Sequence, residues 1–139
     1  MLGADSDFNI VSGRDHNQGT KNYNNAISGE DHTIGNYGFN NEVSGFENVL
    51  GNNTYDNNVS GFRNTLGNNM SQNLVSGRSN AIGNDGSQNT VSGRDNTLGT
   101  ATEANTVGGI NNILGNGYGV DEDDPNNLIT TYGLSLIHI

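Results

Sequence analysis

Two histidines stand 16 residues apart in the first quarter of the sequence, and histidine is a common ligand of transition metals. His16 and His32 directly follow Asp15 and Asp31, so imidazole and carboxylate groups lie together. A structural zinc site needs four ligands, however, and a pair of stacked imidazoles without a third ligand makes a poor one. Every later repeat, from Asn48 onward, has asparagine at the histidine position. We therefore interpret the histidines as substitutions in a structural row.

Acidic residues at one repeat position raise the question of calcium, which prefers carboxylate oxygens. Four of them recur in register: Asp15, Asp31, Glu47 and Asp95. Arg63 interrupts this row, the neighbouring row contains further arginines, and the glycine-rich calcium-binding repeat is absent. The acidic run 121–124 comes before Pro125, and we interpret it as a solvated loop. The sequence therefore predicts no metal ion and no cofactor.

Catalytic residues cannot be separated from the repeat. Six serines recur at a fixed interval: Ser12, Ser28, Ser44, Ser60, Ser76 and Ser92. A side chain that returns in every unit is explained by structure, and no carboxylate pair stands apart as a general acid and base. Solenoid enzymes that degrade polysaccharides break their repeats at the active site, whereas this repeat is unbroken. We predict that the protein is not an enzyme.

Aromatic side chains are the remaining candidates for a binding role. Tyr23, Phe39 and Tyr55 share one repeat position, and Phe46 and Phe62 share another. Rings at equivalent positions of adjacent units gain from offset packing. Three roles stay open for these residues: a ligand platform, a contact between protomers, or local stabilisation of the repeat.

A 16-residue unit positions all of these residues, and it occurs seven times between Asn9 and about Val120. The unit reads N-x-[VI]-S-G-x-x-N-x-[LI]-G-N-x-x-x-x. Asparagine and the aliphatic residue stand two apart, so a strand places them on one face and the variable residue on the other. The glycine that follows permits a positive φ or a close backbone approach at a corner. Two short strands and two glycine corners describe one coil of a parallel β-solenoid.

The predicted fold is therefore all-β, with seven stacked coils of two short strands each. Equivalent side chains would stack about 4.8 Å apart, and asparagine side chains would hydrogen bond to their copies in adjacent coils. Each coil buries only two aliphatic side chains, which favours further burial by self-association.

Composition restricts the partners. The chain has 139 residues, enough for one domain, and a net charge of −10 with five basic residues. Such a charge argues against nucleic acid and against an anionic membrane surface. No apolar run approaches the roughly 20 residues of a membrane span, so we predict no membrane insertion by this segment. Cysteine is absent, which excludes disulfides and thiolate metal sites.

The pattern N-x-V-S-G-x-x-N-x-L-G resembles the head repeats of trimeric autotransporter adhesins, the YadA-like parallel β-roll. The resemblance covers residues 9–120. It implies a left-handed roll and a homotrimer, displayed on the bacterial surface as part of a longer anchored protein. It also implies an extracellular protein or glycan ligand. The coil here has 16 residues rather than the commoner 14, and V-S-G replaces the usual A-I-G, so no specific ligand is carried over.

Four segments are expected along the chain. Residues 1–8 form a truncated lead-in, residues 9–120 the solenoid, and residues 121–133 an acidic insert followed by an atypical cap coil or the start of a neck. Residues 134–139, LSLIHI, match no repeat position and resemble the translation of a sequencing-library adapter. We therefore assign no function to His138.

Two alternatives to an adhesin head, a rigid binding and spacer module, remain open. A monomeric ice-binding solenoid would present a regular threonine array. Thr33, Thr65 and Thr97 share a row, but Val49 and Ala81 interrupt it. A phage fibre or secreted structural repeat protein would differ only in its flanking sequence.

Overall fold

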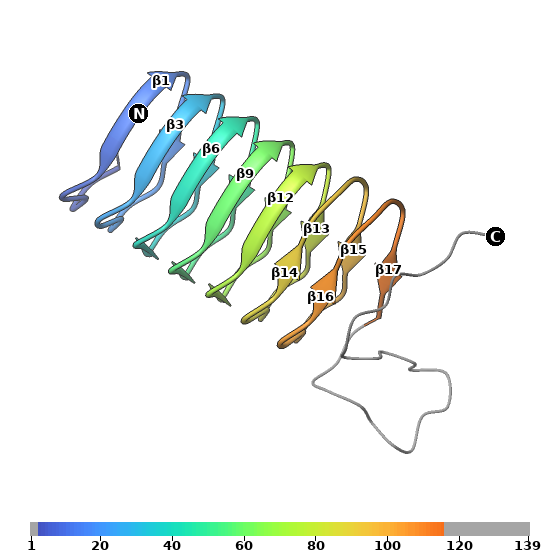
Figure 1. The fold of residues 1–139 in the computed structure, drawn as a ribbon. Helices are drawn as coiled ribbons and strands as arrows, with labels where there is room; N and C mark the ends of the chain where they lie inside the picture. The colour runs from blue at the N-terminus through green and yellow to red at the C-terminus, as the bar shows by residue number, and fades with distance from the viewer. Residues whose placement is uncertain (1–2, 116–139) are drawn as a thin grey trace.

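The structure is a computed structural model and describes residues 3–115. Parallel strands stack into a solenoid of 16-residue coils, and the described residues contain no helix. Figure 1 shows the coils side by side along one axis, with the N-terminal coil at one end. Within the strand pairs, each residue lies opposite the residue 16 positions later, as Val43 does with Val59. The all-β parallel solenoid that the repeat predicts is confirmed.

Three parallel sheets run along the solenoid. The first contains seven strands: β1 (Ile10–Arg14), β3 (Ala26–Glu30), β6 (Glu42–Phe46), β9 (Asn58–Phe62), β12 (Leu74–Arg78), β14 (Thr90–Val91) and β16 (Thr106–Val107). The second also contains seven: β2 (Asn17–Gln18), β4 (Thr33–Ile34), β7 (Val49–Leu50), β10 (Thr65–Leu66), β13 (Ala81–Ile82), β15 (Thr97–Leu98) and β17 (Ile113–Leu114). The third contains three: β5 (Gly38–Phe39), β8 (Thr54–Tyr55) and β11 (Met70–Ser71).

The third sheet adds to the two-stranded coil that the repeat predicts. It lies in the variable stretch at the end of each unit, and isolated parallel bridges such as Ser71 to Ser87 extend it. Its residues alternate like those of any half-buried strand, with Thr54 fully buried and Tyr55 exposed. Pairing also begins ahead of Asn9, because the Lys21 backbone N–H donates to the Ala4 carbonyl at 3.0 Å.

Aliphatic side chains fill the interior in two columns, one behind the first sheet and one behind the second, and Met70 of β11 joins them from the third sheet. The buried set is Ile27, Ile34, Val43, Leu50, Val59, Leu66, Met70, Val75, Ile82, Val91, Leu98 and Val107. The N-terminal coil departs from this pattern. Val11 there is 39% exposed, and Gln18 occupies the second column where later coils have isoleucine or leucine.

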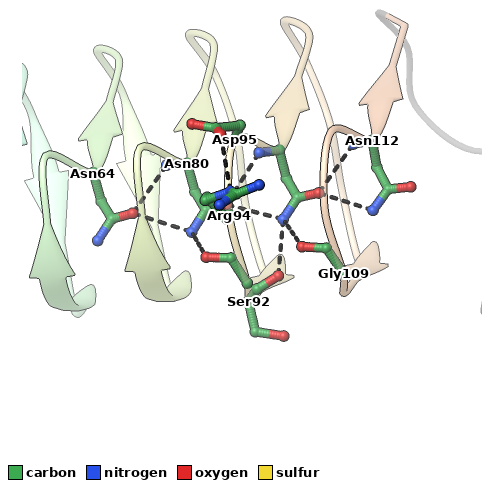
Figure 2. Close-up of polar contacts among 9 residues, drawn as sticks. Asn64, Asn80, Ser92, Arg94, Asp95, Gly109 and Asn112 are labelled. Atoms are coloured by element: carbon green, nitrogen blue, oxygen red, sulfur yellow. Dashed lines mark hydrogen bonds and ion pairs between the residues drawn. The ribbon is translucent and has the colours of Figure 1, made fainter.

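Two columns of buried asparagines complete the interior. In the first, Asn57 Oδ1 accepts both the backbone N–H and the Nδ2 of Asn73, at 3.0 and 2.9 Å. Asn57 Nδ2 in turn donates to the Met70 carbonyl at 3.1 Å. Figure 2 shows the second column, in which the carboxamides of Asn64, Asn80 and Asn112 follow one another along the axis. The asparagine ladders expected from the repeat are therefore confirmed, and their polar groups are paired as buried groups must be.

Left-handed residues other than glycine turn the chain at three repeat positions. One of these positions is the acidic row of the sequence. Its φ angles lie between 53° and 59° at Asp15, Asp31, Glu47, Arg63, Ser79, Asp95 and Asn111. Aspartate and asparagine tolerate this conformation better than most L-residues do. The backbone thus gives a structural reason for the aspartates in that row, although Glu47, Arg63 and Ser79 adopt the same conformation.

Glycine performs both of the roles predicted for it. Gly45 has a φ of 105°, and a Cβ there would overlap the carbonyl oxygen of Gly61. Gly51 has no positive φ, but a Cβ there would come within 2.5 Å of the carbonyl oxygen of Gly67. Neighbouring coils therefore approach too closely at these two rows for any larger residue.

Candidate binding surface

Strand alternation decides which side chains face outward. In β6, Glu42 is exposed, Val43 is fully buried and Ser44 is half-buried. The inward aliphatic and asparagine rows hold nearly the same residue in every coil, whereas the outward rows beside them vary from coil to coil. Any recognition of a partner along the solenoid flank therefore depends on the outward rows.

Phe46 and Phe62 form a stacked pair at the ends of β6 and β9. Their ring centroids lie 5.4 Å apart, and the ring planes differ by 4°. Two guanidinium groups flank Phe62, that of Arg63 at 4.7 Å and that of Arg78 at 5.5 Å from the ring centroid. Cation–π contacts of this kind hold arginine side chains against the ring. We call Phe46, Phe62, Arg63 and Arg78 the phenylalanine–arginine ridge.

Tyr23, Phe39 and Tyr55 form a second aromatic column on the third sheet. The Tyr23 and Phe39 centroids lie 5.0 Å apart with a tilt of 33°, and those of Phe39 and Tyr55 lie 6.0 Å apart with a tilt of 18°. Tyr55 is 43% exposed. Both aromatic columns predicted from the sequence thus form in the structure. Their role in ligand or protomer contact stays a prediction.

Stacking limits what the rings can contact. Phe62 has the Phe46 ring stacked on it and the guanidinium groups of Arg63 and Arg78 close to its ring, so it presents mainly its edge to a partner. Flat stacking of sugar rings on these faces would need them free. Ring edges and arginine N–H groups suit the apolar and carboxylate side chains of a protein partner.

Ion pairs accompany the ridge along the same edge of the solenoid. Arg63 pairs with Glu47 and Arg14 pairs with Glu30, in each case between adjacent coils, and Arg94 Nε lies 3.2 Å from Asp95 Oδ2. The hydrogen bond that Arg63 Nε donates to the Glu47 carboxylate raises the pKa of Arg63. All of these groups are substantially exposed, so solvent screens them and they contribute little to folding stability.

The two histidines lie inside the solenoid. His32 is 1% exposed, with Nε2 2.8 Å from the Ser28 carbonyl oxygen, and its Nδ1 accepts the Asn48 backbone N–H at 3.2 Å. Burial is the main cause that lowers the pKa of His32. His16 stacks on His32 with centroids 5.2 Å apart. Within residues 3–115, no group of three or more histidines and carboxylates is placed to hold a metal ion; the run 121–124 lies outside the described residues.

Threonines do not form a continuous array in the part of the chain that the structure describes. Thr65 pairs with Val49 on one side and Ala81 on the other. The row that ice binding would require is therefore interrupted at alternate coils.

The sequence analysis missed two features, one on this surface and one in the interior of the coils. The arginine contacts to Phe62 follow from adjacent positions, since Arg63 is its chain neighbour and Arg78 follows it in the same row. The third inward row was missed because its members share no side-chain type. They are Asn22, Gly38, Thr54, Met70, Gly86 and Thr102.

Comparison with protein-family models and with curated proteins finds no match to this chain. No helix within residues 3–115 is long and apolar enough to cross a membrane.

Proposed function

We propose that this protein is a non-enzymatic binding and spacer module, the head of a bacterial cell-surface adhesin that acts as a homotrimer. One observation carries the proposal: the inward aliphatic and asparagine rows are nearly uniform, whereas outward rows such as that of Glu42, Asn58 and Leu74 vary from coil to coil. A stiff scaffold of this kind holds varied contact residues at fixed spacing. The resemblance of the repeat to trimeric autotransporter heads supports the same function.

The aromatic columns are the proposed contact surfaces. Edge-presenting rings flanked by arginines favour an extracellular protein over a glycan as the ligand of the phenylalanine–arginine ridge, because sugars stack on free ring faces. Three copies on one trimer would multiply weak individual contacts through a high effective concentration.

Sedimentation equilibrium on the full chain tests the trimer first. We expect a trimer at micromolar concentration, and a folded monomer would contradict the trimeric head. A monomer that also gave thermal hysteresis would favour the ice-binding alternative instead.

Binding to immobilised extracellular-matrix protein, measured by surface plasmon resonance, tests the ligand. The double variant Phe46→Ser/Phe62→Ser should lose binding and remain trimeric if the ridge contacts the ligand. Loss of the trimer would instead assign the ridge to the protomer interface. Leu74→Ser is the matched control, since Leu74 is an apolar side chain on another outward row and is 46% exposed.

A further inference from the structure

Two imidazoles replace carboxamides at one end of the second asparagine column. His16 is 7% exposed and His32 is 1% exposed. The rings stack with their planes 9° apart. From Asn48 onward the column consists of asparagine. The first two coils therefore have an ionisable side chain at an interior position where every later coil has asparagine.

His32 makes two of the hydrogen bonds that asparagine makes at this position in later coils. Its Nε2 lies 2.8 Å from the Ser28 carbonyl oxygen, and Asn48 Nδ2 donates to the Ser44 carbonyl at the same distance. Its Nδ1 accepts the Asn48 backbone N–H at 3.2 Å, as Asn48 Oδ1 accepts that of Asn64 at 2.9 Å. A neutral imidazole offers one donor and one acceptor, so these partners assign the hydrogen to Nε2.

A second proton would disrupt this arrangement. It would sit on Nδ1 and face the Asn48 backbone N–H, so that two donors would oppose each other between adjacent coils. Protonation of both rings would also place two positive charges in one stacked pair. Asparagine cannot undergo either change.

The charged groups around the pair lie on the outer corner. They are Asp15, Asp31 and Glu47 at the left-handed position, and the ion pair of Arg14 with Glu30 beside it. The inward side chains of the same coils do not ionise: Gln18, Asn22, Asn25, Ile27, Ile34, Asn41 and Val43. Burial lowers the pKa of His32 most, and His16 lowers it further, while the Ser28 carbonyl and Asp31 raise it.

We propose that the N-terminal coils are an acid-sensitive segment: protonation of His32 breaks the ladder at Asn48 and opens residues 10–48, while the asparagine-only coils that follow stay closed. Tyr23 and Phe39 lie on the opened coils. If the proposed function is right, acid would therefore also disrupt part of the contact surface formed by Tyr23, Phe39 and Tyr55. The opening itself does not depend on that function.

The direction of the pH effect follows from linkage. An unfolded histidine has a pKa of about 6.5, and that of His32 is lower in the closed coils. The open state therefore binds more protons below about pH 6.5. The closed coils have their full stability above that pH and lose it as the pH falls toward the folded-state pKa.

Hydrogen exchange of the full chain between pH 7.5 and 5.5, corrected for intrinsic rates, tests the proposal. Below about pH 6.5, opening of residues 26–46 should increase by up to roughly tenfold per pH unit for each proton taken up, relative to residues 74–98, and it should change little above that pH. The double variant His16→Asn/His32→Asn restores the column and should abolish this dependence. His138→Asn, which removes the third histidine, should leave it unchanged.

Two results would overturn the proposal. One is an equal pH dependence in the wild type and the double asparagine variant, or in both segments of the wild type. The other comes from the wild type alone, by following the imidazole carbon shifts of His32 by NMR. Titration of that ring with no change in the exchange of residues 26–46 would show that protonation does not open the coils.

Discussion

Asn80 is joined to Asn64 of the preceding coil by two hydrogen bonds to a single oxygen atom. Asn64 Oδ1 accepts the Asn80 backbone N–H at 3.0 Å and its Nδ2 at 3.1 Å. Asn80 Nδ2 also donates to the carbonyls of Ser76 at 2.8 Å and Gly93 at 3.1 Å. One carboxamide therefore satisfies backbone groups of its own coil and of the next, and links its coil to the one before.

Asn80→Ala should lower the free energy of unfolding by about 3 kcal/mol or more. The substitution leaves the Ser76 and Gly93 carbonyls short of a donor and the Asn96 backbone N–H without its acceptor. Each buried group left unpaired costs about 1–3 kcal/mol. Urea denaturation followed by circular dichroism measures the loss.

Asn58→Ala is the matched control for this prediction. Asn58 is exposed, and its Nδ2 donates to Glu42 Oε2 at 2.8 Å on the outer face of the first sheet. Water replaces such a bond, so the change should stay within about 0.5 kcal/mol. Equal losses in Asn58→Ala and Asn80→Ala would contradict a special role for the buried ladder.

The buried aliphatic columns lead to a second prediction, which compares a buried leucine with an exposed one. Leu66 is 1% exposed, whereas Leu74 is 46% exposed. Leu66→Ala should cost about 2–5 kcal/mol, because it removes buried methyl groups and leaves a cavity between coils. Leu74→Ala should cost less than about 1 kcal/mol in the same denaturation experiment. A small loss for Leu66→Ala would mean that neighbouring coils collapse into the cavity.

The fold was predictable because every inward row with a constant residue type leaves a visible signal. Val43 and Val59 pair in register, as do their copies along the first sheet, and the period of 16 places them there without further information. The stacking of Phe46 on Phe62 follows from the same period, since any two residues 16 apart lie on adjacent coils.

The remaining features depend on backbone geometry that side-chain identity does not specify. The inward-facing residues of the third sheet are Gly38, Thr54 and Met70, which differ in size and polarity and share only their burial. The left-handed corners accept residues as different as Asp31, Glu47 and Arg63, so no residue type marks them. Local backbone requirements of this kind can be identified only from the folded structure.

Gly45→Ala should strongly destabilise the protein, by about 2 kcal/mol or more. Its φ of 105° strains any L-residue, and the added Cβ would overlap the Gly61 carbonyl oxygen. Thermal unfolding of the purified variant measures the effect.

Gly108→Ser provides the contrasting glycine substitution. Gly108 aligns with the serine row, and only Ser92 Oγ, at 3.5 Å, comes near a Cβ placed there. Stability should change by less than about 0.5 kcal/mol. A Gly108→Ser variant as unstable as Gly45→Ala would show that any side chain added to glycine disturbs the stack, and that the close approach at Gly45 is not the cause.

Gln18→Ile should stabilise the protein by about 1–3 kcal/mol. Gln18 is 3% exposed in a column that holds isoleucine or leucine in the later coils, and neither polar atom of its side chain has a partner among the described residues. The substitution removes two unpaired buried groups and adds apolar contact with Ile34. Asn17→Thr, on the exposed position beside it, should change stability little. A lower melting temperature for Gln18→Ile would mean that the amide is paired in solution and that the first coil requires a polar residue there.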